Sequence, residues 1–475
     1  MRAGLIALAL GALAATSAGA QQQHLRADQT AFRAIYQELV NIDTSMATGS
    51  CTRAAEAMAA RLRAAGYGDN DLAVIVPEGA PNDANVVAVL HGQPRGPADA
   101  HAILLLAHID VVDARREDWQ RDPFTLVEEN GFFYGRGAAD DKAMASVWVD
   151  LMIRLKQENY HPTRTIRMAL TCGEETSDRV NGVEYLLAHN RDWLAADFAL
   201  NEGAGGTLDA NGRRIALNIQ AGEKVHQVFQ LEVTNPGGHS SRPVPDNAIY
   251  RLSAGLSRLS QFSFPLEVNP VVQAYFARMA AIVGGDTGAA MAVLGRDPTN
   301  AQAAATLSAN PSYNALMRTT CVATMLNAGH AANALPQRAD ATLSCRIMQG
   351  HAPEEIQATL QQVLNDPQIG VTIIKRRDGS QAPPLTPVIM APVEHVAAHM
   401  WPHVAIIPLM TPGATDGRYL NTAGIATYGL SGMFAAEGET NAHGLNEKIR
   451  VRSLYEGRDF LTAVVREYAM QSVSP

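Results

Sequence analysis

The stretch Ala102-Ile103-Leu104-Leu105-Leu106-Ala107-His108-Ile109-Asp110 decides the fold. The segment Ala102–His108 has the length of a strand, and the absence of polar positions from Ala102 to Ala107 suits a strand that is buried on both faces of a sheet. His108 and Asp110 follow at its end, where they share one side of the strand because successive side chains alternate. On its own, this His-x-Asp pair also fits a surface or capping role.

Runs of the same kind alternate with helical patterns through the first half of the chain. Strand-like segments cover Asn85–Leu90, Thr165–Thr171 and Asp197–Asn201, and helical segments cover Ala31–Ile42, Thr52–Ala65, Asp140–Gln157 and Val180–His189. The alternation predicts the α/β class, with a mainly parallel sheet flanked by helices and with loops gathered at one edge.

The pattern changes near Ala221 to that of an α+β module. Its strands are predicted at Val225–Val233, Arg318–Asn327 and Ala339–Ile347, and its helices at Asn247–Leu259 and Pro353–Leu364. The Ala-rich stretch 261–317 is expected to be helical, without a defined place. The α/β pattern resumes near 383, with strands at Val404–Met410 and Ile425–Leu430 and a helix at Val451–Met470. We therefore predict a discontinuous domain, 24–220 and 383–475, interrupted by an inserted lid or dimerisation domain at 221–382.

Length and composition are typical of a large folded protein. The 475 residues exceed what one core of about 150 residues requires, and 47% of them are hydrophobic against 18% charged. The net charge of −9 contains no long block of like charges, which argues against a nucleic-acid partner.

The first twenty residues have the composition of a secretory signal peptide. Arg2 supplies the positive charge, Leu5–Ala15 is apolar, and small residues precede a cleavage site after Ala20. We therefore expect a secreted or periplasmic protein. The apolar run is shorter than the ~20 residues that cross a bilayer, so no membrane span is expected.

Export would permit disulfides, although four cysteines are too few for a disulfide scaffold. Cys321 and Cys345 each lie 12 residues from Asn333 in a predicted hairpin, so they can pair across its strands. No comparable argument exists for Cys51 and Cys172, and four buried free thiols fit the sequence equally well.

Further polar motifs occur at the ends of predicted elements. They are the acidic pair Asp140-Asp141 after a Gly-rich approach, Gly173-Glu174-Glu175 and Asn201-Glu202-Gly203 after strands, and His443 shortly before the last helix. An N-cap explains one Asp of the acidic pair, and a solvated loop explains the adjacent glutamates. Their shared position at one sheet edge, however, favours a site where carboxylates and imidazoles bind two zinc ions.

These motifs together resemble a family, the dinuclear zinc peptidases and deacylases that include glutamate carboxypeptidase, carboxypeptidase S, aminoacylase, carnosinase and succinyl-diaminopimelate desuccinylase. The motifs that carry the resemblance, in chain order, are His108 to Val112, Gly135 to Lys142, Gly173 to Glu175, Gly237 to Pro243, and His443 with Asn446-Glu447. The stretch from Arg318 to Pro336 is most similar to the carboxypeptidase S branch. The resemblance implies a zinc-exopeptidase-like sheet.

The resemblance also implies a role for each matching residue. The zinc ligands would be His108, Asp140, Glu175, Glu202 and His443, with Asp140 bridging the two ions. Asp110 would support His108, and Glu174 would be the general base. His239 of the inserted domain would stabilise the oxyanion, across a dimer interface. Substrate would be bound by Asn333, Arg346 and Arg418.

The function implied is that of an exported zinc-dependent exopeptidase, either a carboxypeptidase or a dipeptidase, which hydrolyses an amide bond through a metal-bridged hydroxide with a Glu general base. The cofactors would be two Zn²⁺ per chain, with Co²⁺ or Mn²⁺ as substitutes. The alternative is an N-acyl-amino-acid amidohydrolase of the aminoacylase kind, and a remote alternative is a non-catalytic metal-binding interaction protein. The expected partners are a small peptide or N-acyl amino acid and a second copy of the chain, which would form a homodimer through the inserted domain.

Overall fold

The computed structural model describes residues 25–93, 101–176, 178–377, 379, 381–411 and 413–471. The predicted signal peptide, Met1–Ala20, lies outside these residues. Among the described helices, none combines the length and the apolar character that a membrane crossing requires.

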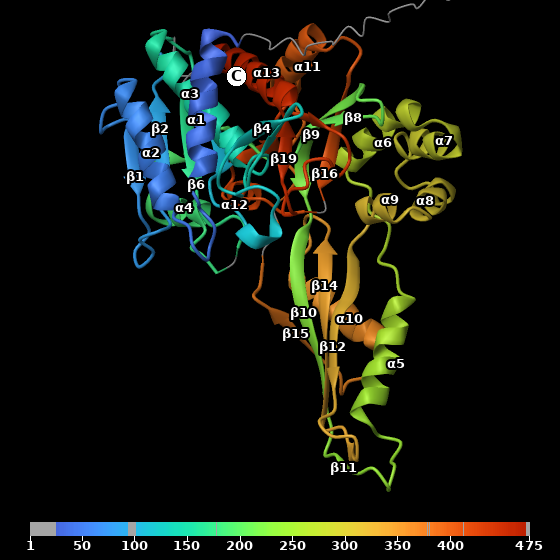
Figure 1. Ribbon diagram of the computed structural model, residues 1–475. Coiled ribbons are helices and arrows are strands. Elements are labelled where there is room, and N and C mark those ends of the chain that lie inside the picture. The colour runs from blue at the N-terminus through green and yellow to red at the C-terminus, as the bar shows by residue number, and fades with distance from the viewer. Residues whose placement is uncertain are drawn as a thin grey trace, which may run out of the picture.

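A ten-stranded sheet forms the centre of the molecule (Figure 1). Its order is β1 (Leu72–Ile75), β2 (Asn85–Leu90), β6 (Thr165–Thr171), β3 (Ala102–His108), β7 (Phe198–Asn201), β17 (Ala426–Gly429), β9 (Arg214–Glu223), β8 (Gly206–Leu208) and β18 (Phe434–Ala435), with β16 (Ala405–Thr411) paired to β9. The four strands β6, β3, β7 and β17 are parallel neighbours. The predicted α/β class with a mainly parallel sheet is confirmed.

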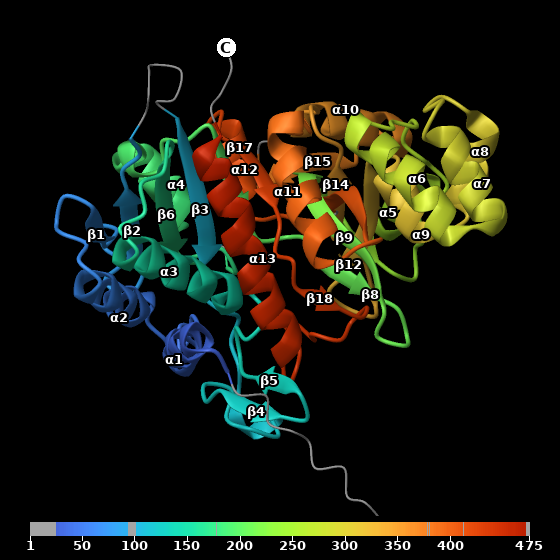
Figure 2. The same cartoon turned by 90° about the horizontal axis from the view of Figure 1, so that it is seen from above.

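Helices cover both faces of this sheet (Figure 2). One face carries α1 (Ala27–Asn41), α2 (Cys51–Ala64), α3 (Lys142–Gln157), α11 (Pro387–Met400) and α13 (Val451–Met470), and the other carries α4 (Gly182–His189) and α12 (Gly417–Thr422). The β3 strand explains the arrangement: Leu105 packs into the core of the first face and Leu104 into that of the second. A run without polar positions therefore has apolar neighbours on both sides.

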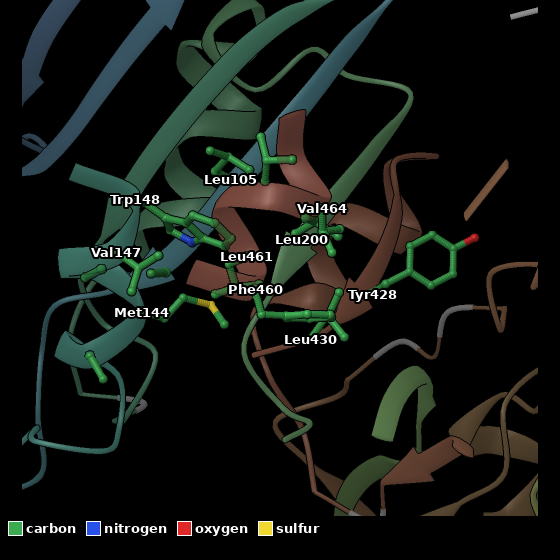
Figure 3. Close-up of a cluster of buried hydrophobic side chains, with 14 of the residues drawn as sticks. Leu105, Met144, Val147, Trp148, Leu200, Tyr428, Leu430, Phe460, Leu461 and Val464 are labelled. Atoms are coloured by element: carbon green, nitrogen blue, oxygen red, sulfur yellow. The ribbon is translucent and has the colours of Figure 1, made fainter. Parts of the chain in front are cut away.

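The core of the first face joins distant parts of the chain. Figure 3 shows Leu105 of β3 together with Trp148 of α3 and Phe460 and Leu461 of α13. All four side chains are fully buried, and the Trp148 indole N–H donates a 2.9 Å hydrogen bond to the carbonyl oxygen of Leu106. Burial of each large apolar side chain stabilises the fold by about 1.5–3 kcal/mol, so this packing fixes α3 and α13 against the sheet.

A second, four-stranded sheet projects from the first (Figure 1). Its order is β12 (Thr320–Ala328), β14 (Arg338–Ile347), β10 (Val225–Thr234) and β15 (Gly370–Ile374), and it carries α5 (Ala248–Ser260) and α10 (Pro353–Leu364). Phe229, Leu343 and Leu360 belong to its separate core. At its far tip β11 (Gly238–His239) pairs with β13 (Ala334–Leu335). We call this part the projecting module.

The Ala-rich stretch 261–317, for which the sequence predicted no defined place, forms helices. It forms α6 (Pro270–Val283), α7 (Gly285–Leu294), α8 (Ala301–Ser308) and α9 (Pro311–Leu316). Val272, Phe276 and Met291 belong to the core of the large sheet, so these helices pack there and not on the projecting module. The domain boundaries at 220 and 382 stay predictions.

All four cysteines are paired in the structure, so the free-thiol alternative is wrong. Cys321 and Cys345 face each other across β12 and β14, as the hairpin argument allowed. Cys51 and Cys172 form the second disulfide, which joins the start of α2 to the residue after β6. The predicted helix from Asp140 also needs correction, because α3 begins at Lys142 and the acidic pair lies in the turn before it.

Candidate active site and metal centre

The parallel strands bring three of the polar motifs to one edge of the large sheet. His108 is the last residue of β3, Glu174 and Glu175 follow β6, and Glu202 follows β7. The carboxyl ends of parallel strands meet at the same edge, which explains the gathering.

Two more elements complete the site. The turn before α3 supplies Asp140, and the loop before β19 (Lys448–Arg450) supplies His443. Both segments flank a small sheet in which β5 (Phe132–Tyr134) pairs with β19 and with β4 (Val127–Glu129).

Asp140 stands between two imidazole–carboxylate clusters. The Nε2 atom of His108 lies 3.2 Å from Oδ1 of Asp140 and 3.8 Å from Oε1 of Glu202. The Nε2 atom of His443 lies 3.3 Å from Oδ2 of Asp140 and 2.8 Å from Oε2 of Glu175. Asp140 therefore presents one carboxylate oxygen to each cluster, which is the placement of a bridging ligand.

The charges of the site favour bound cations. Burial raises the pKa of the Glu202 carboxyl well above its usual range, and the carboxylates of Asp140 and Glu174 raise it further. Burial alone would lower the pKa of His108, but the carboxylates around it, above all Glu202, raise that pKa well above its usual value. Carboxylates that repel one another beside two imidazoles are a donor set that fits two divalent cations, zinc among them.

Asp110 positions the loop that carries the two glutamates. Its carboxylate accepts hydrogen bonds from the backbone N–H groups of Glu174 at 3.2 Å and of Glu175 at 3.1 Å. The sequence suggested that this carboxylate holds the imidazole of His108. Nδ1 of His108 lies 3.6 Å from that carboxylate, within ion-pair distance, and 3.0 Å from the backbone carbonyl oxygen of Asp110. A proton on Nδ1 leaves the lone pair of Nε2 free for the metal side.

Glu447 is a functional residue whose role the sequence did not reveal, although it lies within the His443 motif. Its carboxylate accepts hydrogen bonds from the backbone N–H groups of Gly137 (3.0 Å), Ala139 (2.8 Å) and Asp140 (3.0 Å) and from the guanidinium of Arg136 (2.9 Å). Glu447 thus fixes the backbone that presents Asp140. The sequence feature that could have indicated this role is the place of Glu447 four residues after His443.

Asp416 was also missed, and nothing in the sequence marked it. It is buried, and it accepts hydrogen bonds from the Asn181 amide at 2.6 Å and from the Thr171 hydroxyl at 3.3 Å. The same Asn181 amide donates to the carbonyl oxygen of Gly173 at 3.1 Å. Asp416 therefore stabilises the path of the chain immediately before Glu174.

The predicted substrate-binding residues divide into two groups. Arg346 of β14 lies opposite His226 of β10, and Arg418 lines a cavity that His226 also lines, where the projecting module meets the large sheet. His239 and Asn333 lie instead at the module's tip, where the backbone N–H of Ser240 donates to the carbonyl oxygen of Asn333. Figure 1 shows this tip, at β11, far from the large sheet. Within one chain, His239 and Asn333 are therefore not part of either imidazole–carboxylate cluster.

The comparisons identify the family. Residues 104–467 match the sequence profile of "Peptidase family M20/M25/M40". The chain belongs to this family. Mouse N-fatty-acyl-amino acid synthase/hydrolase PM20D1 is 28% identical to this chain, and the match covers 74% of this chain and 71% of the mouse protein. Rat aminoacylase-1A is 25% identical, and the match covers 79% of this chain and 82% of the rat protein. The crystal structure of the M20 metallo-carboxypeptidase Sso-CP2 from Sulfolobus solfataricus matches with a TM-score of 0.68 at 18% identity, over 94% of this chain and all of that one.

Membership makes this M20 chain a hydrolase of the peptidase and amidohydrolase kind. The resemblance seen in the sequence motifs is thereby confirmed at the level of the family. The identity with Sso-CP2 is too low to carry more than the fold.

Proposed function

We propose that the chain is a zinc-dependent hydrolase that removes the acyl group from N-acyl amino acids. The observation that carries the proposal is the pair of imidazole–carboxylate clusters that share Asp140. The names of the mouse and rat relatives, which concern N-fatty-acyl-amino acids and an aminoacylase, support the substrate class.

The five ligands would be His108, Asp140, Glu175, Glu202 and His443. Bound zinc supplies Lewis-acid chemistry, which lowers the pKa of water and polarises a carbonyl group. Glu174 remains outside the two clusters, with an oxygen that lies within 4.8 Å of His108 and Glu202 ligand atoms. From there Glu174 would accept a proton from the attacking water and pass it to the leaving nitrogen, as a general base and then an acid.

Arg418 and Arg346 would bind the carboxylate of the amino acid that is released. Guanidinium groups recognise carboxylates through paired hydrogen bonds, which suits a substrate with a free carboxylate next to the scissile amide. Exopeptidase action, as a carboxypeptidase or dipeptidase, is the second candidate. It is supported by the family, described as peptidases, and it requires the same carboxylate contact.

A second copy of the chain would supply His239 and Asn333, because the tip of the projecting module is far from its own metal cluster. The edge strand β12 would form the interface. It exposes about 60% of the surfaces of Val322, Met325 and Leu326 on an unpaired sheet edge. Exposed apolar edge strands are sites of pairing with another chain.

We also propose that the protein is exported to the periplasm or secreted. The signal-like start of the sequence supports this, and so do the two disulfides, which persist in oxidising compartments.

The decisive experiment replaces the general base. Glu174→Gln should lower kcat for N-acyl amino acids about 10²–10⁴-fold, while metal analysis still finds two zinc ions per chain. Glu184→Gln, at an exposed position of α4, is the matched control and should behave as wild type. The assay covers N-acyl amino acids and dipeptides, with and without a chelator. Turnover that survives Glu174→Gln, or that is insensitive to chelation, would contradict the proposal.

A further inference from the structure

Neither the sequence motifs nor the proposed mechanism give a role to Arg377. It follows β15 of the projecting module and lines the cavity together with His226 and Arg418. Its backbone N–H donates a 2.9 Å hydrogen bond to the Gln227 amide oxygen, and the Gln227 side chain is buried. The loop that carries Arg377 is thereby fixed against β10.

The cavity lies beside the metal cluster. Glu223 forms part of its wall and also part of the wall of a neighbouring cavity that Glu202 lines. Thr415 connects the two walls, since its backbone N–H donates a 2.7 Å hydrogen bond to Glu223. A substrate whose amide lies at the zinc ligands would have to pass Glu223 to place its released amino acid in the arginine cavity.

The cavity has more positive charge than one carboxylate can neutralise. Arg377 and Arg418 line it, and Arg346 lies opposite its lining residue His226. In the described part of the chain these three side chains make no ion pair, and the Arg418 side chain donates only to the Tyr419 hydroxyl, at 2.9 Å. Lys224 directs its ammonium away, to the carbonyl oxygens of Ala315 and Arg318.

The pKa shifts of two neighbouring residues, His226 and Glu223, agree with this excess of positive charge. Burial lowers the pKa of His226, and the charges of Arg346, Arg377 and Arg418 lower it further. Burial also raises the pKa of Glu223 to about 7, so this carboxyl is only partly available as a counter-charge at neutral pH.

We propose that Arg377 selects substrates in which the released amino acid is acidic. Arg346 and Arg418 would bind the α-carboxylate, and Arg377 would bind the side-chain carboxylate of a glutamate or aspartate residue. A neutral side chain would leave a guanidinium without a counter-charge in a half-buried cavity, which is unfavourable. The inference rests on the proposed amide hydrolysis and adds a specificity to it.

The test compares N-acetyl-glutamate and N-acetyl-aspartate with N-acetyl-glutamine and N-acetyl-asparagine. Wild type should show a kcat/KM for the acidic substrates at least about tenfold higher, the size of one charge-assisted contact. Arg377→Ala should lose that advantage, because its kcat/KM should fall about tenfold more for the acidic substrates than for the neutral ones. Arg376→Ala is the matched control, because the Arg376 side chain contacts Glu354 at 2.7 Å instead of lining the cavity.

Binding measurements separate this inference from the hydrolysis proposal. Calorimetry on Glu174→Gln, with and without Arg377→Ala, should show weaker binding of N-acetyl-glutamate and unchanged binding of N-acetyl-glutamine when Arg377 is absent. An equal loss for both ligands, or no preference for acidic ligands in wild type, would overturn the inference. If acidic ligands bind selectively but no substrate is hydrolysed, the proposed reaction fails and the role of Arg377 stands.

Discussion

Glu447 shows how much of the site depends on a residue that touches neither cluster directly. Its side chain and that of Arg136 are only 1% and 3% exposed, and they form an ion pair beneath the turn that presents Asp140. Removing one partner of a buried pair leaves the other as an uncompensated charge. Glu447→Ala should therefore lower the free energy of unfolding by about 3–5 kcal/mol, measured by urea denaturation.

The same variant should also bind zinc more weakly, because the N–H groups of Ala139 and Asp140 lose their acceptor. Glu128→Ala is the control. It removes the partner of Arg33 from an exposed pair, which contributes about 0–1 kcal/mol. Equal effects of the two substitutions on unfolding would show that Glu447 acts only as a surface charge.

At the scale of single residues, the sequence indicated the candidate metal ligands and the general base better than the residues that hold their loops in place. His108, Glu174 and Glu202 are visible because each follows an apolar run whose end is marked by its own composition. Asp416 has no such mark, since its partners Thr171 and Asn181 are more than 230 residues away in the chain. Asp110 was noticed as a partner of His108, but the hydrogen bonds that its carboxylate also accepts from Glu174 and Glu175 depend on the path of a different loop.

At the scale of elements, the Cys51–Cys172 disulfide ties α2 to the loop that carries the glutamates. Cys172 directly precedes Gly173-Glu174-Glu175, and both cysteines are fully buried. A cross-link over a sequence separation of 121 residues stabilises the fold by about 5 kcal/mol in the loop-entropy treatment, against about 3.5 kcal/mol for the separation of 24 residues between Cys321 and Cys345.

The two cross-links should therefore differ in what their loss does to the metal site. Replacing Cys51 and Cys172 by serine should lower the unfolding midpoint and speed the removal of zinc by a chelator. Replacing Cys321 and Cys345 should lower stability less and leave zinc retention unchanged, because that pair lies within the projecting module. Identical zinc retention in both double variants would contradict the anchoring role of the first disulfide.

Element boundaries were predictable where composition changes abruptly. The bounds of β2, β3, β6, α10 and α13 agree with those predicted from the sequence. The start of α3 was not predictable. An acidic pair is favoured in the first turn of a helix, whereas here Asp140 lies in the turn before α3 and faces the two clusters. The pairing of Cys51 with Cys172 also required the fold, because nothing local relates α2 to the end of β6.

At the scale of the whole molecule, the separation of His239 from the metal cluster makes a quantitative prediction about assembly. His239→Ala should lose about 10²–10³ in rate, the usual effect of one oxyanion donor, and Glu174→Gln should be inactive. If His239 acts across a dimer, a mixture of the two variants should regain about a quarter of wild-type activity. Half of the dimers are then mixed, and one of the two sites in each combines both intact residues.

Pairing Glu174→Gln with His108→Ala provides the control for this complementation. Glu174 and His108 both belong to the large-sheet part of the chain, and their ligand atoms lie within 4.8 Å of each other, so no exchange of projecting modules can restore a site. Subunit exchange is verified by native mass spectrometry of differently tagged chains. Recovery in the first mixture and none in the second would place His239 in the partner's site. If the first mixture exchanges subunits and stays inactive, or if His239→Ala keeps full activity, the projecting module has another role than completing the site of a second chain.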